Sequence, residues 1–204
     1  MSASDLKTVI LYRSKHHGNT KKLVDAIVAA YPSIDVINVE ELGKNEYPDL
    51  SGYHLIGVAS GIYFGEFDKL LKRVLDHVLQ PQDQVFGLMT YGGSDKSYGR
   101  DLAAVCQVKW ANLLTCHGCL GYDTWGPFKL VGGMQKGHPT AEEIQDAVDF
   151  YTKLVDDYGD ILIKQYDDRA KRLAFERAHP RGGLLANIKR SAKKIARRVG
   201  KSGK

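Results

Sequence analysis

Short, almost uninterrupted apolar runs alternate with segments of helical periodicity along most of the chain, and this alternation constrains the fold more than any other feature. The apolar runs cover residues 7–13, 34–40, 53–60, 84–91 and 119–126. Between them, apolar residues recur at helical spacing in 23–31, 67–79, 101–114 and 140–158. Strands that are apolar on both sides need helices on both faces of their sheet. The sequence therefore predicts an α/β fold with five parallel strands and right-handed crossovers.

The last predicted helix marks the end of this pattern. Thr140 and Glu143 match a capping box, which predicts a helix start at Thr140, and Gly159 predicts its end near Tyr158. Residues 1–160 contain 15 Lys and Arg against 21 Asp and Glu, a net charge of −6, whereas residues 161–204 contain 14 against 3, a net charge of +11. We expect a domain at 1–160 and a basic helical extension at 161–204.

Three loops follow the carboxyl ends of predicted strands, where ligands of open α/β sheets bind. The first joins a strand to a helix and is rich in polar side chains. A helix start presents unpaired N–H groups and a favourable dipole, so this loop suits a phosphate group; a merely capped turn is the alternative. A Gly-Lys-Ser/Thr ending and a GxGxxG pattern are both absent. The candidate residues are Ser14, His16, His17, Gly18, Asn19 and Thr20.

The other two loops carry aromatic residues beside glycines, and each also has a structural alternative. In the second loop the aromatic side chains suit one face of a flat ring system, or pack into the core instead. In the third, Tyr98 is either a ring contact or an ordinary residue at a helix start. The candidate residues are Ser60, Gly61, Ile62, Tyr63, Phe64 and Gly65 in the second loop, and Thr90, Tyr91, Gly92, Gly93, Asp95 and Tyr98 in the third.

Together these loops resemble those of flavodoxins. The S-x-x-x-G-N-T pattern ending at Thr20 is similar to the flavodoxin phosphate loop, although it is one residue longer and has His17 where threonine is usual. The third loop resembles the G-x-G-D-x-x-Y form, which implies that Tyr98 stacks on the flavin and that Asp95 lies near it. Residues 121–133 and 136–139 also resemble the end of flavodoxin-family proteins. The resemblance covers about three-quarters of the chain.

This resemblance implies a three-layer flavodoxin-like sandwich with strand order 2-1-3-4-5 and flavin mononucleotide (FMN) as cofactor. The implied function is electron transfer between redox partner proteins. Two alternatives stay open: an FMN-dependent NAD(P)H:quinone-type oxidoreductase and a flavin-free binding module. No catalytic side-chain constellation is evident, and no four-cysteine iron–sulfur pattern occurs. The absence of a signal region and of a long apolar stretch predicts a soluble, cytoplasmic protein.

A cysteine pair and a basic segment near the end of the chain lie outside these loops. Cys116 and Cys119 have the spacing of a redox or half-zinc motif, but ordinary strand cysteines are the favoured interpretation, and a metal site at His16 and His17 is equally disfavoured. Residues 184–199 place apolar side chains on one helical face and basic side chains on the rest. A solvated tail, an anionic membrane surface and an acidic protein partner are the main interpretations, and nucleic acid is the least favoured.

Overall fold

A computed structural model describes residues 5–124 and 132–179 of the chain. Strands and helices alternate along the sequence, as the apolar pattern predicts. The strands are β1 (Thr8–Arg13), β2 (Asp35–Asn38), β3 (Leu55–Gly61), β4 (Gln84–Tyr91) and β5 (Asn112–Leu120). The helices are α1 (Asn19–Ala30), α2 (Lys69–Val78), α3 (Arg100–Lys109) and α4 (Ala141–Ala178).

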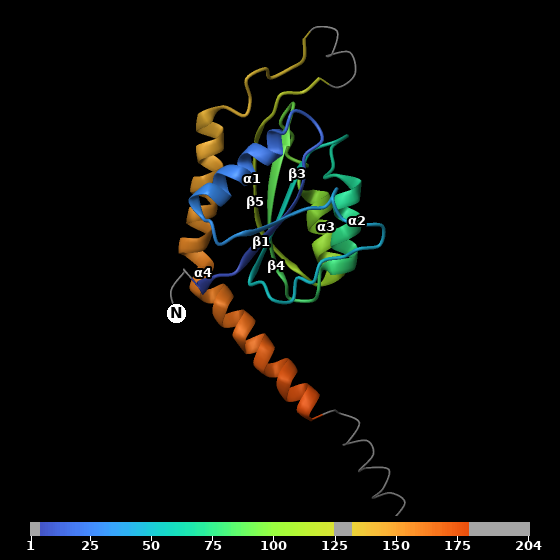
Figure 1. Cartoon of the computed structure of the whole chain (residues 1–204), viewed down its shortest axis with the longest axis vertical. Helices are drawn as coiled ribbons and strands as arrows, with labels where there is room; N and C mark the ends of the chain where they lie inside the picture. The colour runs from blue at the N-terminus through green and yellow to red at the C-terminus, as the bar shows by residue number, and fades with distance from the viewer. Residues whose placement is uncertain (1–4, 125–131, 180–204) are drawn as a thin grey trace, which may run out of the picture. The chain divides into compact units, whose positions relative to one another are not determined.

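The five strands form one parallel sheet of order β2-β1-β3-β4-β5, with helices on both faces (Figure 1). α1 and the first part of α4 cover one face, and α2 and α3 cover the other. Successive residues of a strand point to opposite faces, so Ile10 packs under α1 while its neighbours Val9 and Leu11 pack on the α2 side. The prediction of the three-layer α/β sandwich and its strand order is therefore confirmed.

The predicted bounds of three elements were wrong. The third helix ends at Lys109 rather than at 114, and the last strand is Asn112–Leu120 rather than 119–126, because Trp110 adopts a left-handed backbone conformation that ends α3. α4 continues through Gly159 to Ala178. A glycine inside a helix costs only about 1 kcal/mol relative to alanine, and burial of Leu162 and Ile163 beyond it offsets that cost. The capping box is present, since Glu143 N–H donates to Thr140 Oγ1 and Thr140 N–H donates to Glu143 Oε2.

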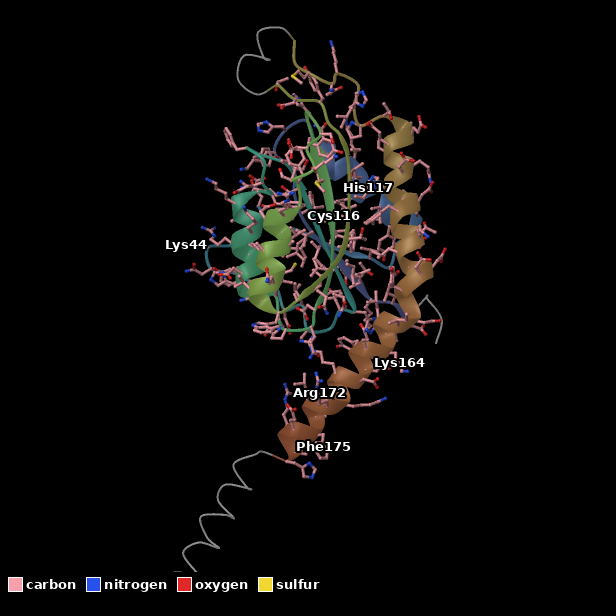
Figure 2. All side chains as sticks on the ribbon, turned by 180° about the vertical axis from the view of Figure 1, so that it is seen from behind. Lys44, Cys116, His117, Lys164, Arg172 and Phe175 are labelled. Carbon is pink, nitrogen blue, oxygen red and sulfur yellow. The ribbon has the colours of Figure 1, made fainter. Side chains whose placement is uncertain are left out.

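Contacts along the chain define two units, Met1–Ile163 and Lys164–Lys204. The sheet and the cores on its two faces belong to the first unit. In the second unit, the described residues form the last part of α4, which bears Lys164, Arg172 and the largely exposed Phe175 (Figure 2). The predicted amphipathic segment 184–199 lies outside the described residues. Among the described helices, none has a stretch long and apolar enough to cross a membrane.

Candidate functional site

A cavity of about 290 Å³ lies where the carboxyl ends of β1, β3 and β4 meet. This is the switch point of the sheet, since the chain leaves β1 toward β2 on one side and returns to β3 on the other. All three predicted loops contribute to its lining. The lining residues are Ser14, His16, Asn19, Thr20, Gly61, Ile62, Tyr63, Phe64, Gly65, Thr90, Tyr91, Gly92, Gly93, Tyr98, Gly121, Tyr122, Asp123 and Met134.

The first loop leaves the N-terminus of α1 without a side-chain cap. Gly18 occupies the N-cap position with φ +65°, and a Cβ atom there would meet no other atom within 4 Å. By contrast, Asp68 caps α2 by accepting from the N–H groups of Leu70 and Leu71. The dipole of α1 favours an anion beside this open space, although Asn19 N–H donates to His16 O at 3.4 Å and Lys21 N–H donates to Ser14 Oγ at 3.3 Å.

The polar side chains of the first loop are held by hydrogen bonds. The Thr20 and Thr90 hydroxyls are hydrogen bonded at 2.9 Å, which joins the loop to the end of β4. Asn19 donates through Nδ2 to Tyr122 O at 2.8 Å, while its buried Oδ1 has no partner among the described residues. Ser14 Oγ accepts from Lys21 N–H at 3.3 Å. Because buried polar atoms are normally hydrogen bonded, the orphan Oδ1 is compatible with a donor supplied by a ligand.

Two cations near the first loop are already neutralised. Asp68 accepts from Arg13 at 2.8 Å and from Lys15 Nζ at 2.6 Å, and its side chain is only 1% exposed. Burial acts to raise the pKa of Asp68, but the hydrogen bonds from Lys15 and Arg13 outweigh it and hold the pKa below its ordinary value. Ser60, expected in the site, instead lies beneath it, where its Oγ accepts from Asp68 N–H at 3.0 Å. The loop therefore presents the start of α1 to the cavity, while Arg13 and Lys15 are paired with Asp68.

The second loop forms a tight turn that raises an aromatic side chain at the cavity. Tyr63 and Glu66 exchange two backbone hydrogen bonds, and Phe64 and Gly65 between them both have positive φ, the pattern of a type I′ turn. Phe64 is 84% exposed. Tyr63 is more buried: its hydroxyl accepts from Lys15 N–H at 3.3 Å and Lys15 Nζ lies 5.2 Å from its ring. Burial raises the pKa of the Tyr63 hydroxyl.

The third loop supplies Tyr98 to the cavity but not Asp95. The rings of Tyr91 and Tyr98 lie 5.4 Å apart, and Tyr91 OH donates to Gly118 O at 3.1 Å. Partial burial, followed by the nearby Asp95 carboxylate, raises the pKa of Tyr98. Asp95 turns back on its own loop and accepts from Ser97 N–H at 2.7 Å. Among the described lining residues, the carboxylate is that of Asp123, whereas Asp95 is not part of the lining.

The sequence interpretation missed four lining residues, all on the connection from β5 to α4. Gly121, Tyr122, Asp123 and Met134 reach the cavity because Asp123 and Met134 pair through two backbone hydrogen bonds of 2.9 and 2.7 Å. The resemblance of residues 121–133 to flavodoxins was the available signal for this segment, of which 125–131 lie outside the described residues. Of the two histidines, His16 lines the cavity, whereas His17 and Gly18 do not.

Cys116 and Cys119 do not form a joint site. They lie three residues apart on β5, so their side chains point to opposite faces of the sheet: Cys116 packs on the α3 side and Cys119 under α4. His117, next to Cys116 in Figure 2, stacks on Phe150 of α4. Burial raises the pKa of Cys116 to about 11 and that of Cys119 to about 12. Across residues 5–124 and 132–179, no group of His, Cys, Asp and Glu is arranged to hold a metal ion.

Comparisons with known proteins place this fold and this chain among relatives. No family model matches the chain. The uncharacterized protein MJ0298 of Methanocaldococcus jannaschii is 34% identical over 148 residues, which span 71% of this chain and 95% of MJ0298. RosB, solved with the bound intermediate 8-demethyl-8-formylriboflavin-5'-phosphate, has a TM-score of 0.51 at 16% identity, over 84% of this chain and 87% of that one. The Flv1 flavodiiron core from Synechocystis has a TM-score of 0.56 at 16% identity, and the match covers 80% of this chain and 37% of the Flv1 chain.

The two kinds of similarity support different statements. The structural neighbours, at 16% identity, establish the fold alone, and the sheet order β2-β1-β3-β4-β5 is that of flavodoxin-like proteins. The similarity to MJ0298 covers most of both chains at 34% identity. The chain therefore has a flavodoxin-like fold and belongs to the same family as MJ0298.

Proposed function

We propose that this protein binds FMN in the cavity at the carboxyl ends of β1, β3 and β4. The observation that carries the proposal is the N-terminus of α1, with Gly18 as its N-cap residue, which borders the same cavity as the aromatic rings of Tyr63 and Tyr98. A helix start suits the phosphate of a mononucleotide, and aromatic walls suit its flat ring. The bound riboflavin phosphate derivative of RosB, a protein of the same fold, supports this choice of ligand.

Within this proposal, the protein holds and orients the flavin, and the flavin supplies reversible transfer of one or two electrons. The residues at hand for the phosphate are Ser14, Asn19 and Thr20 with the N–H groups of α1, and those for the ring are Tyr63 and Tyr98. Among the described residues that line the cavity, Asp123 is the only carboxylate and none is Lys or Arg.

We further propose that the protein carries electrons between redox partner proteins. This role needs only one flavin site with an accessible edge, and the cavity is bordered by the exposed Phe64. The second candidate is an NAD(P)H-dependent reductase that passes electrons to a quinone-type acceptor. It needs room for a nicotinamide beside the flavin, and the described residues that line the cavity include no Lys or Arg suited to a nucleotide phosphate.

The test is the absorption spectrum of the purified protein before and after addition of FMN. We expect a yellow protein, or a colourless one that takes up one equivalent of FMN with quenching of flavin fluorescence. A colourless protein that refuses FMN would reject both redox functions and leave a flavin-free binding module. For the flavin-loaded protein, NADH and NADPH are added without a partner enzyme. Slow or absent bleaching supports the carrier, and rapid bleaching would replace it with the reductase.

For the basic extension, we propose contact with an anionic membrane surface. The proposal rests on the sequence of residues 184–199, where basic side chains flank an apolar face, and on the net charge of +11 over residues 161–204. We expect the full chain to sediment with vesicles containing phosphatidylserine, and deletion of 184–204 to abolish this. Binding that survives the deletion, or binding only to an acidic protein, would contradict the membrane proposal.

A further inference from the structure

His17 stands where the resembling flavodoxin loops have threonine, and its ring does not reach the cavity. The ring packs instead against the connection that follows β5. His17 Nε2 is 2.9 Å from Thr124 Oγ1, and the centroid of the His17 ring is 4.2 Å from that of the Tyr122 ring. His17 also has a positive φ of 54°, which a non-glycine residue adopts at some cost. A strained residue held by two side-chain contacts points to a role for those contacts.

The segment that His17 contacts is a wall of the cavity. Tyr122 and Asp123 line the cavity, and Asp123 pairs with Met134 through two backbone hydrogen bonds. Tyr122 OH donates to Gly132 O at 3.0 Å, and a Cβ atom on Gly133 would lie 2.5 Å from the Tyr122 ring, so the two sides of the connection are in close contact.

The first loop fixes this wall through two adjacent anchors. One is Asn19, whose Nδ2 donates to Tyr122 O at 2.8 Å. The Asn19 side chain also packs so closely on Gly121 that a Cβ atom there would lie 2.8 Å from Asn19 Nδ2. The other is His17, which contacts Tyr122 and Thr124. Asn19 is buried and lies within α1, whereas His17 precedes the helix and is exposed.

We propose, building on the proposed FMN function, that His17 is a positioning residue: it holds the wall of Tyr122 and Asp123 in place for the ring of the flavin and does not contact the phosphate. Removal of the His17 ring loses a hydrogen bond and an aromatic contact that order this wall. The helix start of α1 and its N-cap residue Gly18, where the phosphate is proposed to bind, are not altered by this change. His17 therefore sets affinity for the isoalloxazine half of the ligand.

The test compares three ligands, FMN, riboflavin and inorganic phosphate, by titration of the wild-type protein and His17→Ala. We expect the dissociation constants of FMN and riboflavin to rise together, each roughly tenfold, while that of phosphate changes by less than about twofold. If FMN and phosphate weaken while riboflavin does not, His17 contacts the phosphate and the proposal is overturned. A wild-type protein that binds neither flavin rejects the FMN function itself, a result distinct from either pattern.

Two further variants separate the ring contacts from backbone strain and from misfolding. Asparagine tolerates a left-handed backbone, so His17→Asn should bind riboflavin as weakly as His17→Ala; wild-type affinity in this variant would overturn the role of the ring. Thr124→Val should weaken riboflavin binding in the wild-type background and have no effect after His17→Ala. If the losses of riboflavin affinity caused by His17→Ala and Thr124→Val add up in the double variant, the two residues do not act through their mutual contact. Urea unfolding midpoints close to that of the wild type show that each variant is folded.

Discussion

Replacement of Asp68 by asparagine probes the most buried charged group near the site. Asparagine keeps the size of the side chain and an oxygen that caps α2, but removes the charge that faces Arg13 and Lys15. Breaking a buried ion pair costs about 3–5 kcal/mol because one charge stays unpaired. Here the Arg13 side chain keeps Glu40 as a partner and Lys15 is 37% exposed, so it can turn to water. We therefore expect Asp68→Asn to lower the free energy of unfolding by about 2 kcal/mol, which is less than that range.

The pH dependence of this loss follows from the lowered pKa of Asp68. A carboxyl whose pKa is lower in the folded protein than in the unfolded chain stabilises the fold above its unfolded pKa, about 3.9. That stabilisation disappears as pH falls through the folded pKa. The free energy of unfolding in urea should thus differ fully between wild type and Asp68→Asn at pH 5–7, and the difference should be smaller near pH 3.

The matched control is Asp25→Asn, which breaks the exposed Lys21–Asp25 pair on α1. Exposed pairs contribute little, so this variant should change the free energy of unfolding by less than about 0.5 kcal/mol. If Asp68→Asn and Asp25→Asn lower the free energy of unfolding by equally small amounts, the buried ion pair of Asp68 does not stabilise the fold as argued. The reasoning on Asp68 is also refuted if the loss on Asp68→Asn is as large at pH 3 as at pH 7.

Three smaller predictions concern the turn at Phe64, the start of α4 and the cysteines. Phe64→Asn should raise the melting temperature by about 2 °C, since asparagine tolerates the left-handed conformation that strains phenylalanine; a lower melting temperature would contradict the strain. Thr140→Ala should cost about 1 kcal/mol in urea unfolding through loss of the capping box, and an unchanged midpoint would argue against it. The thiols of Cys116 and Cys119, with pKa values of about 11 and 12, should react with a disulfide reagent at pH 7.5 only after denaturation; prompt reaction of the native protein would show accessible thiolates.

The sequence predicts the central strands well because their physical signal is local. β1, β3 and β4 are almost wholly buried, so their apolar runs are unbroken. The start of β5 carries no such signal: Ala111, Leu113 and Leu114 continue the helical spacing of α3, and only the left-handed conformation of Trp110 separates helix from strand. Gly159 predicts a helix end because glycine destabilises a helix locally. The burial of Leu162 and Ile163, which lets α4 continue, depends on tertiary packing that the local sequence does not show.

The same distinction applies to the site. The three loops were predictable because polar and glycine-rich residues directly follow buried strands. The direction of each loop side chain was not: His16 points to the cavity and its neighbour His17 to Tyr122. Asp123 lines the cavity and pairs with Met134, a contact set by tertiary structure rather than by the local sequence, while Asp95 bonds within its own loop.

The central claim, that the cavity at the α1 N-terminus binds FMN, is tested most directly by fluorescence titration of FMN with wild type and Gly93→Leu. Gly93 lines the cavity, has no positive φ, and would place a Cβ atom more than 4 Å from other atoms, so the variant should fold while its added side chain narrows the cavity. We predict saturable binding of one FMN per wild-type chain and a large loss of affinity in Gly93→Leu. Absence of wild-type binding, or equal affinity of the two proteins, would contradict the claim.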